Sequence, residues 1–419
     1  MRWFLISLWF VVCGLFVPPP AKAQSTCDDS IHVSPALTDF TGPYQRLKWR
    51  SQGSTAPAEY EAFPDYSGGL YPYGANVRPP THEAAGVAIA NQIQPLDTDG
   101  DPDPNGQIGM LAIGMSNTKQ EFDTFLRLFD EPSDPHSSQV NPQLKVVDGA
   151  LGGGVLEIWS NPNHQSYPTY WQYLDDQLTL ANLDPNQVQI VWIKITEMDY
   201  LAAFPDNILR YEDRIKTLIK AEVYRRFPYA KITYLSSRTR AHAYHIGNLN
   251  PEPYSFETGL GVRAVIEDQL NGTDLNYDPA YGPVIAPYLS WGPYLWIDGL
   301  NPRLTDGRTW TKEYVFDNDC VHPMDVAKAE VAAMLWEFFS TDTTTTPWFL
   351  ADELPTPTPT PLPTPSPTPL AGDYDDDGDR DLVDLRQLLG SFGSQNDLLN
   401  LIGTGLIDIF DFNFLVQYL

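Results

Sequence analysis

Three residues of this chain are best suited to chemistry. They are a histidine, an aspartate close to it in sequence, and a serine far from both. Asp319 stands three residues before His322, so a single loop can hold a carboxylate against the imidazole. Ser116 directly follows the apolar run 108–115. A histidine oriented by a carboxylate can take the proton of a serine hydroxyl and turn that serine into a nucleophile. These residues predict acyl transfer through a serine.

The elements that must position these residues alternate between strand-like and helix-like runs. Most of the apolar strand candidates are followed by a segment whose apolar residues have helical spacing. This alternation indicates a parallel sheet with helices on both faces. The expected strands are 108–115, 144–147, 188–193 and 232–235, and the expected helices are 117–131, 167–182, 207–227 and 323–339. Ligands of such sheets bind at the carboxyl ends of the strands. Ser116, the run 148–154 and Lys194 all fall at such ends.

Backbone amides near Ser116 are candidates for stabilising a developing oxyanion. A helix that starts at Asn117 would point its unpaired amides at such a charge, although Ser116 could also simply cap that helix. The run 148–154, Asp-Gly-Ala-Leu-Gly-Gly-Gly, allows a close approach of the backbone. One of its amides could complete an oxyanion hole, and a tight connecting loop is the alternative.

These motifs resemble conserved blocks of a known family. Gly-Met-Ser-Asn-Thr at 114–118, Asp-Gly-Ala-Leu-Gly-Gly at 148–153 and Asp-Cys-Val-His-Pro at 319–323 look like the first, second and fifth blocks of SGNH/GDSL-type hydrolases. The resemblance covers roughly residues 100–340. It implies an α/β fold, a flavodoxin-like three-layer α/β/α sandwich with a parallel sheet. It also implies ester hydrolysis through an acyl-enzyme, with no cofactor for catalysis.

The resemblance also implies a role for each site residue. Ser116 would be the nucleophile, His322 the general base and Asp319 its orienting partner. The amides of Ser116 and Gly153 would donate to the oxyanion. The rivals for the second donor position are Gly152 and Gly154.

Two departures from the family pattern stand out. Met115 occupies a position where the family usually has Asp, and no Asn follows the third expected strand, where the third block supplies one to the oxyanion hole. Lys194 or Thr196 could donate in its place, whereas Glu197 could do so only when protonated. The missing Asn motivates a second hypothesis, a catalytically impaired scaffold that acts as a binding or cell-surface assembly protein.

Several other polar groups have weaker claims to function. Arg238 and Arg240 could bind a carboxylate or sugar hydroxyls, or form structural ion pairs. His242 and His245 could share a metal, but no carboxylate cluster accompanies them. The acidic run 97–106 resembles half of a calcium loop and is better interpreted as a turn.

The regions outside the expected sheet are rich in aromatic, Pro and Gly residues. Residues 24–106 are interpreted as a wrapping segment, and residues 246–315 as irregular aromatic loops. The second region could wall a substrate cleft or form a packed aromatic layer. Its most prominent rings are Trp291, Tyr294, Trp296 and Trp310.

The amino terminus has the pattern of a secretory signal peptide at 1–23. Arg2 precedes the apolar run 3–17, and Ala-Lys-Ala at 21–23 gives a small-x-small cleavage pattern, with an uncleaved anchor as the alternative. Cleavage would leave Cys27 and Cys320, which predict one disulfide in an exported chain, or else two free thiols. We expect a secreted or cell-surface protein with no membrane span after cleavage.

A Pro-Thr repeat at 354–370 separates two expected domains, 24–353 and 371–419. Alternating Pro holds such a linker in extended polyproline conformation. The second domain opens with acidic residues at positions 1, 3, 5, 7, 9 and 12 of a twelve-residue calcium loop, with Gly378 at its sharp turn. The acidic residues are Asp373, Asp375, Asp377, Asp379, Asp381 and Asp384.

The acidic loop with its following helix resembles a type I dockerin, a small all-α calcium-binding domain. A second, degenerate copy at 400–411 has Ile402 at a ligand position. The resemblance implies bound Ca²⁺ and a cohesin-type partner protein.

The net charge of −28 argues against binding nucleic acid or anionic lipid through charge. Together, these features predict a secreted serine ester hydrolase that removes acyl groups, preferably acetyl, from a carbohydrate such as a polysaccharide.

Overall fold

The computed structural model describes residues 27–131, 133–197, 203–244, 249–351, 374, 382–392, 412 and 416. The chain divides into two compact units, Met1–Asp352 and Glu353–Leu419. The signal segment expected at 1–23 and the linker expected at 354–370 lie outside the described residues.

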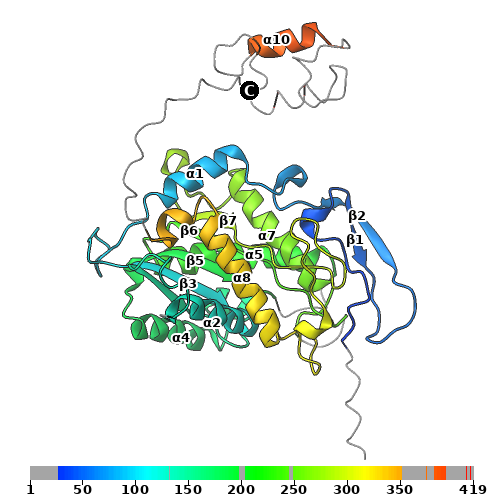
Figure 1. Ribbon diagram of the computed structural model, residues 1–419, viewed down its shortest axis with the longest axis horizontal. Helices are drawn as coiled ribbons and strands as arrows, with labels where there is room; N and C mark the ends of the chain where they lie inside the picture. The colour runs from blue at the N-terminus through cyan, green and yellow to red at the C-terminus, as the bar shows by residue number, and fades with distance from the viewer. Residues whose placement is uncertain are drawn as a thin grey trace, which may run out of the picture. The chain divides into compact units, whose positions relative to one another are not determined.

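A five-stranded, all-parallel sheet forms the centre of the first unit (Figure 1). Its strands are β3 (Ile108–Gly114), β4 (Leu144–Asp148), β5 (Val188–Lys194), β6 (Ile232–Leu235) and β7 (Tyr288–Trp291), in the order β4-β3-β5-β6-β7. Every residue of β3 and β5 is buried, which explains their continuous apolar runs. The predicted α/β class with a parallel sheet is confirmed.

Helices cover both faces of this sheet, and alternate residues of each strand face opposite helix layers. In β3, Leu111 and Ile113 pack with α4, α5 and α7, whereas Met110 and Ala112 pack with α1, α2 and α8. The longer helices are α1 (Pro80–Ala90), α2 (Ser116–Asp130), α4 (Tyr167–Leu180), α5 (Asp206–Thr217), α7 (Tyr254–Leu270) and α8 (Asp325–Thr341). Figure 1 shows α2 and α8 side by side on one face.

Short elements complete the first unit. A two-stranded antiparallel ribbon, β1 (Pro43–Leu47) and β2 (Tyr60–Ser67), lies within the expected wrapping segment. The shorter helical turns are η1 (Leu37–Asp39), η2 (Pro72–Gly74), α3 (Leu156–Ser160), η3 (Pro185–Gln187), η4 (Leu218–Val223), α6 (Tyr224–Arg226), η5 (Pro279–Tyr281), η6 (Lys312–Tyr314) and α9 (Thr346–Phe349). No helix of the described residues is long and apolar enough to cross a membrane.

The region 246–315 is more regular than expected, because it contains α7 and β7. Most of α7 is buried on several faces, so it lacks the single apolar stripe that marks an amphipathic helix. Gly259 and Gly261 lower its helix propensity, yet both are needed for close packing. A Cβ on Gly261 would lie 2.5 Å from the ring of Tyr211, and one on Gly259 would lie 2.9 Å from Leu37.

The described part of the second unit is the helix α10 (Leu382–Gly390) with a few residues around it. Leu388 is fully buried and packs with Tyr374, Leu385 and Phe412. The side chain of Asp384 is buried, and its Oδ1 accepts a hydrogen bond from the Tyr374 amide at 2.5 Å. The second loop expected at 400–411 lies outside the described residues.

Candidate active site

Ser116 is the first residue of α2, directly after the strand β3. Met115 occupies the cap position in extended conformation, so Ser116 does not cap the helix. Gly114 is the last residue of the strand, and only glycine fits there, because a Cβ would lie 2.4 Å from the carbonyl oxygen of Lys194. The Thr118 hydroxyl donates to this same carbonyl at 2.5 Å. The start of α2 is therefore fixed against the neighbouring strand β5.

The structure brings Ser116, His322 and Asp319 into one hydrogen-bonded chain. Ser116 Oγ lies 2.8 Å from His322 Nε2, and His322 Nδ1 lies 2.8 Å from Asp319 Oδ2. Both distances fall within the range that proton transfer requires. The side chains of His322 and Asp319 are 22% and 20% exposed, so the chain is partly open to a reactant.

The loop that carries His322 is shaped by its own aspartate. Asp319 Oδ1 accepts hydrogen bonds from the amides of Val321 and His322, both at 2.9 Å. The other oxygen, Oδ2, faces the imidazole. One carboxylate thus fixes the backbone of the loop and the orientation of the ring at the same time.

Three contacts with distant segments anchor the same loop. A disulfide joins Cys320 to Cys27, near the start of the described chain. The amide of His242, in the segment after β6, donates to the carbonyl of Cys320 at 2.8 Å. The Asn117 side chain donates to the carbonyl of Val321 at 3.0 Å, which ties the loop to the residue after Ser116. Sequence reasoning missed this role of Asn117, although its place beside Ser116 was a usable signal.

The glycine loop after β4 lies next to Ser116. A Cβ on Gly152 would lie 4.0 Å from the Cβ of Ser116. Within the described residues, the amides of Gly152 and Gly153 have no hydrogen-bond acceptor, whereas the Gly154 amide donates to Leu151 at 2.9 Å. Gly154 is therefore engaged elsewhere, and Gly152 and Gly153 are the candidates for a second oxyanion donor.

Lys194, expected among the oxyanion donors, instead forms an ion pair with Glu121 of α2. Both side chains are fully buried, so the ammonium does not face an open site. Burial lowers the pKa of Lys194 to about 8, although the Glu121 carboxylate opposes this shift. The expectation fails because a carboxylate on the buried face of α2 needs a cation, and the end of β5 supplies it.

The other residues after β5 are also engaged in pairs. The Thr196 hydroxyl accepts a hydrogen bond from the Asn250 side-chain amide at 2.5 Å and donates its own proton to the carbonyl of Glu197 at 3.4 Å. Glu197 pairs with Arg214, and burial raises the pKa of Glu197 to about 6 even though Arg214 lowers it. We therefore find no replacement for the third-block Asn among Lys194, Thr196 and Glu197.

The weaker candidates Arg238, Arg240 and His242 are buried and contact other parts of the protein. Arg240 pairs with Asp298 and donates to Tyr244 Oη at 2.9 Å. Arg238 is buried, with Nη1 3.3 Å from the sulfur of Met115, directly before the nucleophile candidate. His242 is buried too, and burial lowers its pKa to about 3. These groups support the loops around the site.

Two weaker metal candidates lie outside the second unit, the pair His242 and His245 and the acidic run 97–106. No group of three or more His, Cys, Asp or Glu residues that could hold a metal occurs within the described ranges, and His245 lies outside them. In the acidic run 97–106, Asp97 Oδ1 accepts from the amides of Asp99 and Asp101 at 2.9 and 3.0 Å. The carboxylate thus closes a turn on its own backbone.

Comparisons with known proteins give weak likenesses only. No family model matches the chain, and no curated protein matches it. Among solved structures, a candidate SGNH hydrolase from Slackia heliotrinireducens is similar at 15% identity and a TM-score of 0.31, over 56% of this chain and 99% of that one. The YXIM protein of Bacillus subtilis is similar at 11% identity and a TM-score of 0.30, over 57% of each chain.

A third similar structure is the C-terminal catalytic domain of peptidoglycan O-acetyltransferase A (OatA) from Streptococcus pneumoniae, with a methylsulfonyl adduct. It shares 11% identity at a TM-score of 0.27, over 59% of this chain and 99% of that domain. The structural neighbours are thus SGNH hydrolase and acyltransferase-like proteins. Likenesses this weak do not assign an activity, which is inferred below from the geometry around Ser116.

Proposed function

We propose that this protein is a serine ester hydrolase that works through an acyl-enzyme. The observation that supports the proposal is the hydrogen-bonded chain from Ser116 Oγ through His322 to Asp319, with 2.8 Å at both steps. A serine, an imidazole and a carboxylate in this arrangement are the three groups that nucleophilic acyl transfer requires.

In this mechanism, Ser116 Oγ attacks the ester carbonyl while its proton passes to His322 Nε2. Asp319 keeps the Nδ1–H of the ring in place and stabilises the imidazolium that forms. The developing oxyanion accepts hydrogen bonds from the Ser116 amide and from Gly152 or Gly153. Such donors typically contribute about 3 kcal/mol each. The alcohol leaves with the proton from His322, and His322 then activates the water that releases the acyl group.

We propose an acetylated carbohydrate as the substrate class. The expected aromatic cleft contributes less than its sequence suggested, because Trp296 and Trp310 are fully buried in the core. Trp291 and Tyr294 border a cavity beside β7, but they too are buried, at 3% and 6% exposure. The partly exposed site and the resemblance of the second unit to a dockerin support this substrate class.

The second unit is proposed to bind one Ca²⁺ through the acidic loop 373–384 and to dock onto a cohesin-type partner. The buried Asp384 supports the calcium proposal. Its side chain accepts a hydrogen bond from the Tyr374 amide, which connects position 12 of the loop with position 2. The remaining acidic positions, Asp373, Asp375, Asp377, Asp379 and Asp381, lie outside the described residues. The proposed signal segment at 1–23 would direct the protein out of the cell.

Turnover of p-nitrophenyl acetate by the full chain tests the esterase proposal. Ser116→Ala should lower turnover at least about 10³-fold, because no other group in the proposed mechanism replaces the nucleophile. Ser67→Ala, at a partly buried serine of β2, is the matched control and should keep full activity. Treatment with a sulfonyl fluoride should label Ser116, as read by peptide mass spectrometry. Unchanged turnover by Ser116→Ala would remove Ser116 from the mechanism.

The alternative is a catalytically impaired scaffold that binds without turning over. The pairing of Lys194, Thr196 and Glu197 favours it, because the missing third-block Asn then has no substitute among them. A folded wild-type protein with no turnover of acetyl esters and no sulfonyl label on Ser116 would support this alternative.

Calorimetry on the full chain tests the calcium proposal. We expect one tight Ca²⁺ site, which Asp375→Ala and Asp377→Ala together should abolish without changing ester turnover. Absence of binding heat in the wild type would contradict the calcium-loop interpretation.

A further inference from the structure

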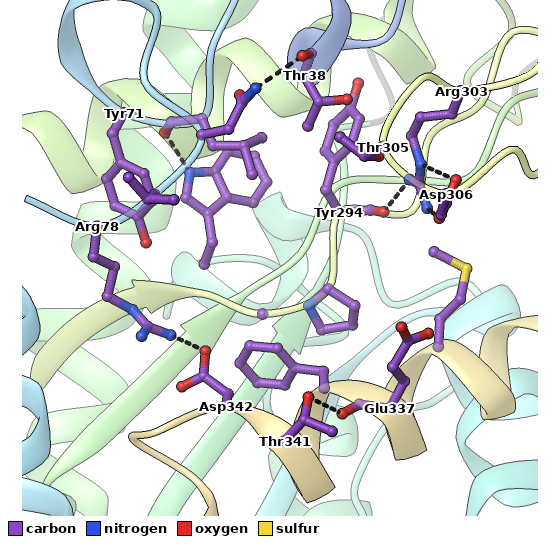
Figure 2. Close-up of a pocket in the computed structure, with 18 of the residues that line it drawn as sticks. Thr38, Tyr71, Arg78, Tyr294, Arg303, Thr305, Asp306, Glu337, Thr341 and Asp342 are labelled. Carbon is purple, nitrogen blue, oxygen red and sulfur yellow. Dashed lines mark hydrogen bonds and ion pairs between the residues drawn. The ribbon is translucent and has the colours of Figure 1, made fainter. Parts of the chain in front are cut away.

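A cavity of about 760 Å³ lies beside the edge strand β7 (Figure 2). The loop after β7, the segment around Tyr71 and Arg78, and the end of α8 form its walls. Its volume falls within the usual range of sites for small organic ligands. The proposed mechanism makes no use of this cavity.

The cavity is separate from the candidate active site. None of Ser116, Asp319 and His322 lines it. His322 lies just before the start of α8, whereas the cavity is bordered by residues from Met334 to Thr343 at the far end of that helix. A helix of 17 residues is about 25 Å long. The cavity therefore needs an explanation of its own.

Rigid aromatic side chains make up part of the lining. The indole of Trp291 donates to the carbonyl of Leu70 at 2.6 Å. Tyr71 Oη lies 3.3 Å from Ser290 Oγ, and Tyr294 Oη accepts from the amide of Leu37 at 3.0 Å. These bonds hold the polar ends of the rings in place. Because these side chains are already fixed, the cavity keeps its shape without a ligand, and binding orders few side chains.

The charged side chains of the lining are paired with one another. Arg78 bridges Glu83 at 2.7 Å and Asp342 at 2.6 Å. Figure 2 shows Arg78 and Asp342 meeting on one wall of the cavity, and Arg303 and Asp306 meeting on another. Each of these arginines thus has a carboxylate partner already.

The second charged wall is a shared cluster. Arg308 contacts Asp306 at 2.8 Å and Glu337 at 2.9 Å. Burial alone would raise the pKa of Asp306, but hydrogen bonds from Arg303 and Arg308 outweigh burial and lower it to about 2. Asp306 therefore stays ionised in its pairs with Arg303 and Arg308 at neutral pH.

We infer that this cavity is a binding site for a neutral carbohydrate. Paired guanidinium and carboxylate groups present hydrogen-bond donors and acceptors together, which suits ligand hydroxyls. An anion would face four carboxylates among the described lining residues against three arginines. A wholly apolar ligand would desolvate these charges without compensating hydrogen bonds. The rings of Tyr71, Trp291 and Tyr294 are only 2%, 3% and 6% exposed, so they shape the cavity, and the polar groups of its walls provide the contacts to the ligand.

This inference does not depend on the proposed esterase activity. If both hold, the cavity would bind sugar units of a polymer while Ser116 acts on an ester elsewhere along it. Binding to the cavity and turnover at Ser116 are separate measurements, so one proposal can fail while the other stands.

Titration calorimetry of the full chain with xylotetraose and cellotetraose tests the inference. Thr305 is exposed and lines the cavity, so Thr305→Trp should obstruct part of the cavity without disturbing the core. We expect at least one neutral tetrasaccharide to bind, and Thr305→Trp to weaken that binding at least tenfold. Thr55→Trp, at an exposed threonine that does not line the cavity, should bind as the wild type does.

A second blocking variant and a charged probe complete the test. Val77 is 74% exposed and lines the cavity from another segment of the chain. Val77→Trp should therefore also weaken binding. Both variants should keep wild-type turnover of p-nitrophenyl acetate. No binding of either neutral probe, unchanged binding by both variants, or stronger binding of tetragalacturonate would overturn the inference.

Discussion

The candidate active site and the cavity beside β7 use polar side chains in opposite ways. At Ser116, one carboxylate and one imidazole form a single directed chain that ends at one oxygen. In the cavity, guanidinium and carboxylate groups cancel each other in pairs, and no comparable chain leads to a nucleophile among the described lining residues. The first arrangement concentrates reactivity on one atom. The second spreads hydrogen-bonding capacity over a surface, which suits recognition.

The two regions also differ in how the fold builds them. Ser116 and the glycine loop stand at the carboxyl ends of adjacent parallel strands, β3 and β4, where such sheets commonly hold their sites. The cavity is assembled from segments outside the sheet together with the edge strand. We therefore expect changes at one region to leave the other largely intact.

Among changes that keep the Ser116 nucleophile, the largest effect should come from Asp319→Asn. An amide in place of the carboxylate would favour the wrong tautomer of His322, so turnover should fall roughly 10²–10⁴-fold. Tetrasaccharide affinity at the cavity should not change. Asp317→Asn, at an exposed position of the same loop, is the control. Near-normal turnover by Asp319→Asn would show that the hydrogen-bonded chain through His322 does not contribute to catalysis. The contrast between the candidate active site and the cavity would then fail.

A smaller effect is expected from replacing the disulfide in Cys27→Ser/Cys320→Ser. The variant should lose about 2–5 kcal/mol of unfolding free energy, measured by denaturant titration. Turnover should fall less than in Asp319→Asn, because the His242 and Asn117 contacts still hold the loop. A loss of tetrasaccharide affinity as large as the loss of turnover would mean that the disulfide supports the whole unit rather than the His322 loop.

The smallest effect concerns Glu252, which connects the loops that follow β6 and β7. Its buried carboxylate accepts from the Ala241 amide at 3.0 Å and the Trp296 indole at 2.9 Å. Burial raises the pKa of Glu252 from 4.5 to about 7, although Arg240 opposes the shift. Between these values the folded chain keeps a proton that the unfolded chain has lost. The contribution of protonated Glu252 to the free energy of unfolding is therefore complete below about pH 4.5 and is lost as the pH rises toward 7.

Glu252→Gln should remove this dependence. The slope for one such group is about 1.4 kcal/mol per pH unit, so the wild type should lose about 2 kcal/mol more than the variant between pH 5 and 7. Unfolding free energies at the two pH values give the measurement, and Glu61→Gln at an exposed position is the control. Equal slopes in wild type and Glu252→Gln would show that Glu252 ionises normally in the fold.

The core of the fold was predictable where apolar runs are long and periodic. Four of the five sheet strands and the helices α2, α4 and α8 lie close to their predicted ranges. The strand β7 was missed because it is short and lies in an aromatic, Pro-rich region. The helix α7 was missed because packing on several faces removes its periodicity. In both cases tertiary burial, rather than local propensity, decides the structure.

The amino-acid sequence by itself determined the short-range parts of the candidate site. Asp319 and His322 are three residues apart, so their pairing depends on one loop, and Ser116 directly follows a strand that apolar pattern alone identifies. Only the tertiary structure decided which donors remain available. Lys194 is engaged because a distant carboxylate, Glu121, is buried against it, and the cavity beside β7 forms from segments far apart in the chain. Burial and ion pairing depend on such long-range neighbours, and residue spacing does not encode them.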